Sequence, residues 1–356
     1  MIKEKQLTAM MINAIAVKML MTFPRSLFEN CGNSVWLAVI LSTVAVYGMV
    51  WIIGRMYTSD KSLVGLSEQL GGKGLKIAVG TAVFIILSLN LVSVLRIFPE
   101  IIRLVLLQQT YTEVIGLAFL AVIVIGAACG IEAIARVHSF FIPIAAGAFG
   151  VFLLMLIPNL SISKLFPILG KGISSLFLKG SSAISVFNDI LLMNILIPYT
   201  NLGVNYKKAG LRSVIFGGIC CLLIVLFYGM IYVYPTSAEL LIPVYQLERV
   251  INLGDFFSRL EALFQFIWSI SILLYAIMYI CTLSLLWKET FDLSHSKPLI
   301  VPITLLLASL AALPRSVNGM IEIERIIAKW NYIPSFLIIL IIGIVSCETF
   351  MGKDKK

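Results

Sequence analysis

The sequence predicts an all-α polytopic membrane protein with ten transmembrane helices. Of the 356 residues, 60% are hydrophobic and only 13% are charged, whereas a soluble domain carries roughly 25% charged residues. The mean hydropathy is +1.02. So few charged side chains cannot cover the surface of a soluble fold, and the bilayer is the expected solvent for most of the chain.

Long apolar runs give the positions of the predicted spans. A bilayer core about 30 Å thick needs ~20 mostly apolar residues per helix, and short connectors separate such runs here. In chain order we predict spans at 7–23, 35–53, 75–95, 114–135, 137–157, 182–199, 211–234, 260–287, 299–313 and 332–346. Because the connectors are short, residues 1–356 are predicted to form a single membrane domain.

The distribution of lysine and arginine predicts the orientation. Lys3 and Lys5 precede the first apolar run in the manner of a signal peptide, but the run lacks a small-residue cleavage site and contains Lys18. We therefore predict a retained first span. Basic residues are slightly more frequent in connectors on the side of the N-terminus, which predicts that both termini are cytoplasmic. The net charge of +9 is assigned to these loops and to anionic lipid rather than to nucleic acid.

Lys18 is the most unusual residue of the first span. A lysine near the middle of a membrane helix costs about 2.5–3.5 kcal/mol on insertion scales, so something must compensate for its charge. One explanation is that the side chain extends to the headgroup layer. The other, which we favour, is that Lys18 faces a partner or a cavity inside the bundle.

Asp189 is the candidate partner of Lys18. It lies in the sixth span beside Asn188, and the first and sixth spans occupy equivalent places if the ten helices form two repeats. Inverted-repeat transporters place their binding sites at such positions, on broken helices. The hypothesis is a Lys18–Asp189 pair at a central cavity; the alternative is two independent polar residues at different helix contacts.

Other polar residues are assigned structural roles. Glu132 and Arg136 are spaced i, i+4 near the predicted cytoplasmic end of the fourth span, as in a helical salt bridge. Arg259 and Glu261 open the eighth span and are predicted to pack against neighbouring helices. His138 falls near a span end, where a hydrated position is expected. No enzyme motif, metal-ligand spacing or cofactor motif is recognised.

Several motifs in the same order resemble one known family. They are the opening span through Phe23-Pro24, Ser34-Val-Trp-Leu-Ala38, Arg96-Ile-Phe-Pro-Glu100, Gly130-Ile-Glu-Ala-Ile-Ala-Arg136, Leu165-Phe-Pro-Ile-Leu-Gly-Lys-Gly172, and Ser258-Arg-Leu-Glu-Ala-Leu263 leading to Trp268. The chain thus resembles the spore germination permease-like proteins, the integral B subunits of nutrient germinant receptors. This family is similar to the amino acid–polyamine–organocation transporters.

The resemblance implies an architecture and partners. It implies a five-plus-five inverted repeat over about 7–157 and 182–346, with broken first and sixth helices. It also implies a nutrient-sensing role in the spore inner membrane beside an A-type subunit and a lipoprotein C-type subunit. Asp189 matches an acidic position common in the sixth span of the family.

Candidate ligand-binding residues follow from the two broken helices: Asn13, Ala14, Lys18, Asn188 and Asp189. The segment from Ala14 to Lys18 lacks the glycine with which related transporters expose backbone N–H groups to a substrate carboxylate. Lys18 could supply that positive charge, replace a coupling cation, or plug a pathway that no longer transports. The leading function is a receptor subunit for a small nutrient such as an amino acid; a proton- or cation-coupled amino acid transporter and a pore are the alternatives.

Overall fold

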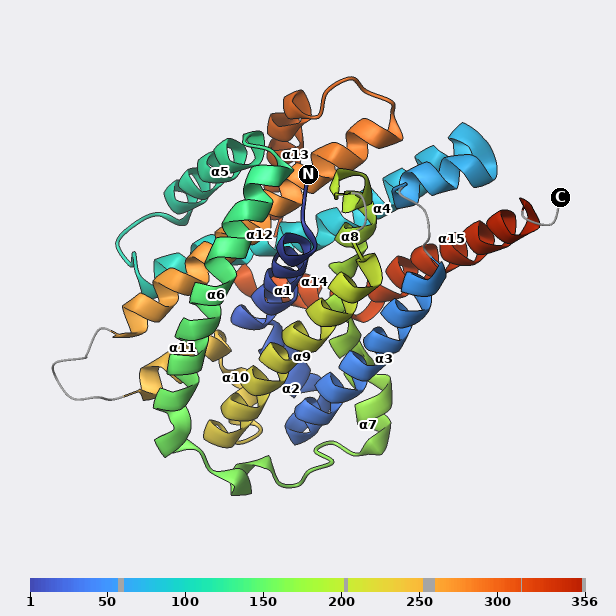
Figure 1. Ribbon diagram of the computed structural model, residues 1–356. Helices are drawn as coiled ribbons and strands as arrows, with labels where there is room; N and C mark the ends of the chain where they lie inside the picture. Colours follow the sequence, from blue (N-terminus) through green and yellow to red (C-terminus); the bar gives the residue numbers. More distant parts are fainter. Residues whose placement is uncertain (57–60, 202–203, 252–259, 315, 354–356) are drawn as a thin grey trace.

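The computed structural model describes residues 1–356 except 57–60, 202–203, 252–259, 315 and 354–356, and the described chain folds into a bundle of helices (Figure 1). The α-helices are α1 (Glu4–Leu20), α2 (Phe23–Cys31), α3 (Val35–Met56), α4 (Leu63–Val105), α5 (Thr112–Ala128), α6 (Ile131–Leu156), α7 (Ile173–Leu178), α8 (Ile190–Leu196), α9 (Tyr206–Ile231), α10 (Thr236–Glu239), α11 (Pro243–Val250), α12 (Leu260–Thr290), α13 (Ile300–Ala312), α14 (Val317–Trp330) and α15 (Tyr332–Lys353).

Six helical segments of the described chain are long and apolar enough to cross a bilayer: Phe23–Gly54, Leu63–Val105, Ile131–Asn159, Ile173–Tyr199, Tyr206–Ile231 and Ala262–Thr290. The count differs from the predicted ten partly because three predicted spans fall on shorter helices. These are α1 and α5, of 17 residues each, and α13, of 13 residues. The tenth predicted span falls on α15, which follows the separate helix α14.

Glycines move two predicted boundaries. The fourth span was predicted to run to residue 135, but α5 ends at Ala128 and α6 begins at Ile131. Gly130 lies between them with φ 85°, a left-handed conformation that glycine adopts without a steric penalty. Similarly, α4 begins twelve residues before the predicted third span and is kinked at Gly71 and Gly72.

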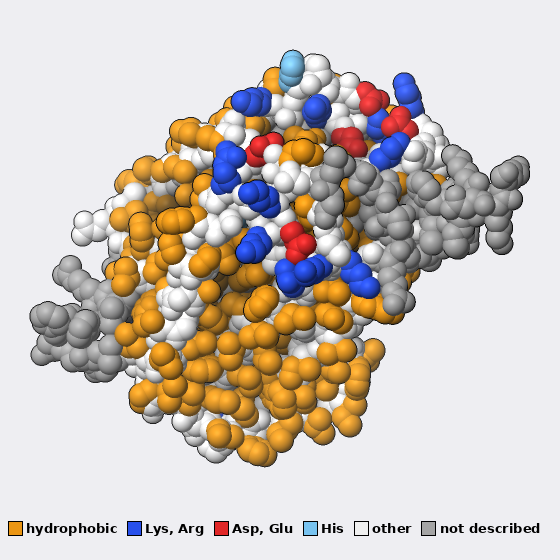
Figure 2. All heavy atoms as spheres, in the orientation of Figure 1, with side chains coloured by type: hydrophobic (Ala, Val, Ile, Leu, Met, Phe, Trp, Pro, Cys, Tyr) orange, Lys and Arg blue, Asp and Glu red, His pale blue; other side chains and the backbone are white. Residues whose placement is uncertain are grey.

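The outer surface of the bundle is apolar, as expected for a protein solvated by lipid. Large hydrophobic side chains protrude from the helices, among them Leu117 and Ile125 on α5, both 68% exposed, and Phe140 on α6, 75% exposed. Charged side chains gather toward one end of the visible face, and hydrophobic ones cover most of the remainder (Figure 2). This separation matches a polar end at the membrane surface and a body within the bilayer.

Helix α1 lies at the centre of the fold. It packs against α6, α9 and α12 and lies between them in Figure 1. Its side chains are buried on several faces, with Met10, Met11 and Ile15 fully enclosed. A helix that is buried on all sides is expected to carry apolar side chains all round. The charged side chain of Lys18 departs from this expectation and needs a partner nearby.

Two interruptions distinguish this bundle from a set of straight helices. The first separates α1 from α2 at Met21 and Thr22, and Gly32 then ends α2 with φ 61°. The second lies in the sixth predicted span, 182–199, where the structure has the 3-10 segment η4 (Gly180–Phe187), α8 and the 3-10 segment η5 (Ile197–Tyr199), with the short helix α7 before them. Such breaks free backbone groups for other partners. Segment η4 packs against α1, α2, α3 and α14, so the two interruptions lie together.

The contact between α1 and α9 provides a test of the packing. A Cβ atom added to Gly217 in α9 would lie 2.7 Å from Cγ2 of Ile15 in α1. We therefore expect Gly217→Ala to lower the free energy of unfolding in detergent by about 1–3 kcal/mol, the usual cost of overpacking. The control is Gly147→Ala in α6, where a Cβ meets nothing within 4 Å. Similar losses for both variants would contradict the close approach.

Candidate functional site

Lys18 and Asp189 form a buried ion pair between the two interrupted segments. Nζ of Lys18 lies 3.1 Å from Oδ1 of Asp189, and the two side chains are 11% and 0% exposed. Lys18 also donates to the backbone oxygen of Ser185 at 2.9 Å. The ammonium is therefore directed into the protein, and the alternative that it reaches the headgroup layer is wrong. The predicted contact is present, whereas a ligand-binding role for the two residues stays a prediction.

The position of the pair follows from the local structure. Lys18 lies in the last turn of α1, where the negative end of the helix dipole favours a cation. Asp189 directly precedes α8, a helix of seven residues, and its side chain makes no cap hydrogen bond there. The end of α1 thus favours the Lys18 charge, and the two charges meet where α1 ends and α8 begins.

Further polar groups surround Asp189. The hydroxyl of Tyr279 in α12 donates to Oδ1 of Asp189, the same oxygen that contacts Lys18. Among the described residues, Oδ2 of Asp189 and both amide atoms of Asn188 have no hydrogen-bond partner, and both side chains are buried. Buried polar atoms are normally satisfied. The region therefore retains hydrogen-bonding capacity for water or a ligand.

A small polar cavity of about 30 Å³ lies beside Lys18. One water needs roughly 10–15 Å³ measured in this way, so the cavity holds about two waters. Its polar lining residues are Lys18, Asn90, Ser93, Ser185 and Glu324, and its apolar ones include Met21 and Ala328.

Glu324 on α14 lines this cavity and is a candidate site residue that sequence reasoning missed. Its Oε2 accepts a hydrogen bond of 2.6 Å from the hydroxyl of Thr22, in the break between α1 and α2. Residues 314–331 contain several charges and were assigned to a connector. The missed signal is an amphipathic period, because α14 buries Met320, Ile321 and Ala328 on one side.

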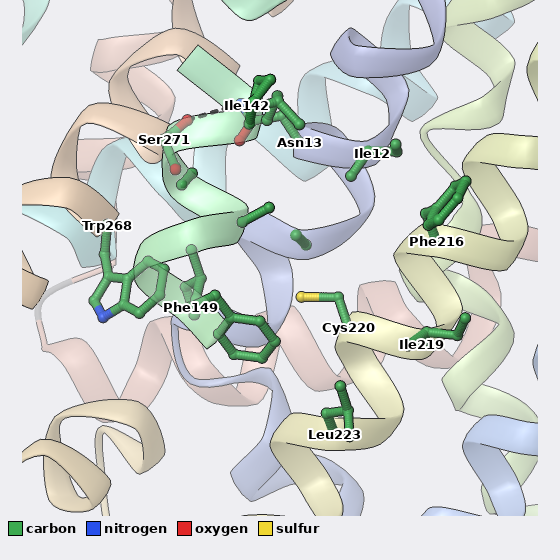
Figure 3. Close-up of a pocket in the computed structure, with 15 residues that line it drawn as sticks. Ile12, Asn13, Ile142, Phe149, Phe216, Ile219, Cys220, Leu223, Trp268 and Ser271 are labelled. Atoms are coloured by element: carbon green, nitrogen blue, oxygen red, sulfur yellow. Dashed lines mark hydrogen bonds between the residues drawn. The ribbon is translucent and has the colours of Figure 1, made fainter. Parts of the chain in front are cut away.

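A larger pocket of about 370 Å³ lies between α1, α6, α9 and α12, and Figure 3 shows its lining. Its walls are mainly apolar and include Phe149, Leu223 and Trp268. Asn13 lines this pocket, and its Nδ2 donates to the backbone oxygen of Ser271 at 3.0 Å. It also lies 3.4 Å from Nε2 of His138.

The predicted ligand-binding set is therefore divided. Asn13 does not join Lys18, because five residues on a helix of 3.6 residues per turn place their side chains roughly 140° apart. Ala14 is fully buried and is not among the residues that line either cavity. His138 was expected near water, but it is fully buried, and its Nδ1 lies 2.9 Å from the backbone oxygen of Ile134.

The predicted structural residues have different outcomes. Glu132 lies in the first turn of α6 and pairs with the amino group of Met1 at 2.9 Å. Arg136 lies on the same helix, but the predicted salt bridge between Glu132 and Arg136 is not among the ion pairs of the described residues. Arg259 lies outside the described residues, and nothing is described for the side chain of Glu261.

Comparisons with known proteins agree with this architecture. A family model described as "Spore germination protein" matches residues 1–320. The chain belongs to this family. It is 24% identical over 195 residues to spore germination protein B2 of Bacillus subtilis (strain 168), and the match covers 53% of this chain. It spans about half of that relative, 52% of its length. The resemblance drawn from the sequence motifs is thus confirmed.

Solved structures show the same fold in transporters. Mhp1, a nucleobase-cation-symport-1 family transporter in a closed conformation with bromovinylhydantoin bound, has a TM-score of 0.62 at 13% identity, covering 90% of this chain and 74% of its own. MhsT in complex with L-phenylalanine has a TM-score of 0.62 at 15% identity, covering 93% and 87%. The fold is LeuT-like. Family and fold together describe a permease-like germination protein of the membrane, not an enzyme.

A double-mutant cycle tests the ion pair. Asp189→Asn leaves the Lys18 ammonium buried without an anionic partner, and Lys18→Met does the converse, so each is expected to lower the free energy of unfolding by about 3–5 kcal/mol. The double variant removes both charges and is expected to recover most of that loss. Thermal unfolding in detergent measures the cycle. Lys208→Met, at an exposed position on α9, is the control and should change little. Additive losses in the double variant would contradict the pairing.

Proposed function

We propose that this chain is the membrane subunit of a spore nutrient germinant receptor. In this proposal it binds a small nutrient, such as an amino acid, between the two interrupted helices and signals to A-type and lipoprotein C-type partner subunits. Membership of the spore germination protein family supports the receptor role. The observation that carries the binding site is the buried Lys18–Asp189 pair at the meeting point of both interruptions.

The proposed topology is ten spans in a five-plus-five inverted repeat, about 7–157 and 182–346, with both termini cytoplasmic and the protein in the spore inner membrane. The interruptions support it, since they fall at 21–22 and within 179–189, in the first and sixth predicted spans. Inverted-repeat transporters bind their ligands at such paired breaks. Mhp1 and MhsT, which share the fold, were solved with bromovinylhydantoin and L-phenylalanine.

The size of the polar cavity supports a sensing mechanism. About 30 Å³ admits water but not an amino acid, so ligand binding requires the helices that line the cavity to move apart. A ligand then favours the open arrangement by its differential affinity for the two states. Partner subunits in contact with the moving helices would detect that shift.

A coupled transporter is the second candidate, favoured by the likeness of the fold to a cation symporter. In that case Lys18 and Asp189 would take part in proton or cation coupling. The two functions differ in flux, since a receptor needs only binding, whereas a transporter must release its ligand on the other side.

The experiment is a thermal-shift screen of the purified protein with the twenty standard amino acids, followed by uptake of each hit into proteoliposomes. We expect at least one hit and no concentrative uptake. The Lys18→Met/Asp189→Asn variant is expected to fold but to lose at least tenfold in apparent affinity, because it removes the Lys18 charge at the cavity together with the carboxylate that pairs with it. Lys208→Met, the control, should retain binding. Saturable, gradient-dependent uptake would support the transporter instead, and the absence of any hit would contradict the ligand site.

A further inference from the structure

We propose that Glu324 binds a cationic group of the ligand, so that the receptor site selects ammonium compounds. This inference rests on the proposed function, since it concerns the same polar cavity. It adds the residue that recognises the ligand and the charge that the ligand must carry.

Among the residues that the structure describes, Glu324 forms no ion pair, although it lines the same cavity as Lys18. The ammonium of Lys18 is occupied by Asp189 at 3.1 Å and by the backbone oxygen of Ser185 at 2.9 Å. The hydrogen bond shown for Glu324 comes from the neutral hydroxyl of Thr22. With both carboxylates ionised, Lys18, Asp189 and Glu324 carry a net charge of minus one.

Basic residues on the described part of α14 do not neutralise Glu324. Arg325 is adjacent in sequence, but its guanidinium pairs with Glu29 on α2. The Nζ of Lys329 lies 5.2 Å from the ring centre of Trp330. Neither residue lines the polar cavity. A negative charge in a region of low dielectric constant strongly favours a nearby cation.

The backbone at the cavity adds to this preference. Helix α1 ends at Leu20, and Met21, the residue that follows, lines the cavity. The C-terminal end of a helix carries a partial negative charge that stabilises cations within about one turn. Lys18 uses part of this potential from within the helix, and a ligand cation beside Glu324 would lie near the same helix end.

Asn90 on α4 supplies a second contact. It lines the cavity, and its Oδ1 accepts a hydrogen bond from Asn331 at 3.2 Å. Its buried Nδ2 has no hydrogen-bond partner among the described residues. An amide N–H can donate only to an acceptor. The ligand chemistry that fits both residues is therefore an ammonium group together with an oxygen acceptor.

The competing explanation is that Glu324 carries a proton. A neutral carboxyl would need no cation, and its replacement by glutamine would then leave ligand selection unchanged. The two explanations therefore differ in what Glu324→Gln does to ligands that differ only in charge.

The test uses L-alaninamide, in which an ammonium group lies beside an amide oxygen, and L-lactamide, in which a hydroxyl replaces that ammonium. Thermal-shift titrations compare the full-length protein with Glu324→Gln and with Glu322→Gln, a matched control at an exposed position of the same helix. We expect L-alaninamide to stabilise the wild type and the control. Its half-maximal concentration should rise at least tenfold in Glu324→Gln, and L-lactamide should produce no comparable shift.

Three results would overturn the inference: equal responses to the two amides, an unchanged L-alaninamide response in Glu324→Gln, or no L-alaninamide response in the wild type. If amino acids or L-lactate still bind in a manner that depends on Lys18 and Asp189, the proposed ligand site stands although the inference fails. If Glu324→Gln does not fold, Glu324→Asp is the second variant, because its shorter side chain keeps the negative charge but moves it away from the cavity. The half-maximal concentration of L-alaninamide is then expected to rise in the same way, and an unchanged response would again overturn the inference.

Discussion

The buried ion pair between Lys18 and Asp189 is the interaction on which the centre of this protein depends. It links α1 to the segment before α8, at 3.1 Å and almost out of reach of solvent. Neither charge is stable alone at this depth, because desolvation costs several kcal/mol per ion. The pair thus holds the last turn of α1 against the start of α8, next to the break between α1 and α2.

The sequence predicts the membrane class, most of the spans and this pair, because each depends on a local pattern. Apolar runs, a lysine inside one run and an aspartate inside another can be recognised without tertiary information. The two charged residues indicate a contact because burying an ionisable side chain in a membrane span costs free energy unless it has a partner. The contact between them follows from pairing the first and sixth spans.

The remaining features depend on tertiary contacts that no local pattern contains. Glu324 belongs to a charged stretch that is typical of a connector, and only tertiary structure places it beside Thr22, at 2.6 Å, in the lining of the cavity. Asn13 is a polar residue in the first span, as expected of a binding site. Its position on α1, however, places its side chain at the apolar pocket beside His138. The break at Gly130 depends on one positive φ angle, whereas the apolar pattern continues through it.

A fixed ammonium beside the cavity has an energetic consequence for sensing. In the proposed receptor nothing is transported, so the Lys18 ammonium stays in place beside Asp189 and no ion gradient supplies energy. The free energy that shifts the protein between its two states must then come from the ligand. Reversing a 1:99 population takes about 5.5 kcal/mol of differential binding free energy.

The size of the ligand limits the binding free energy that it can supply. Small ligands gain at most about 1.5 kcal/mol per non-hydrogen atom, so a nutrient of roughly six such atoms must realise most of that maximum. A charge-assisted contact in a cavity with room for about two waters is an efficient source of that energy, since its strength rises as a ligand displaces the water. The proposed contact of the ligand with Glu324, which lines this cavity together with the paired Lys18, would supply it.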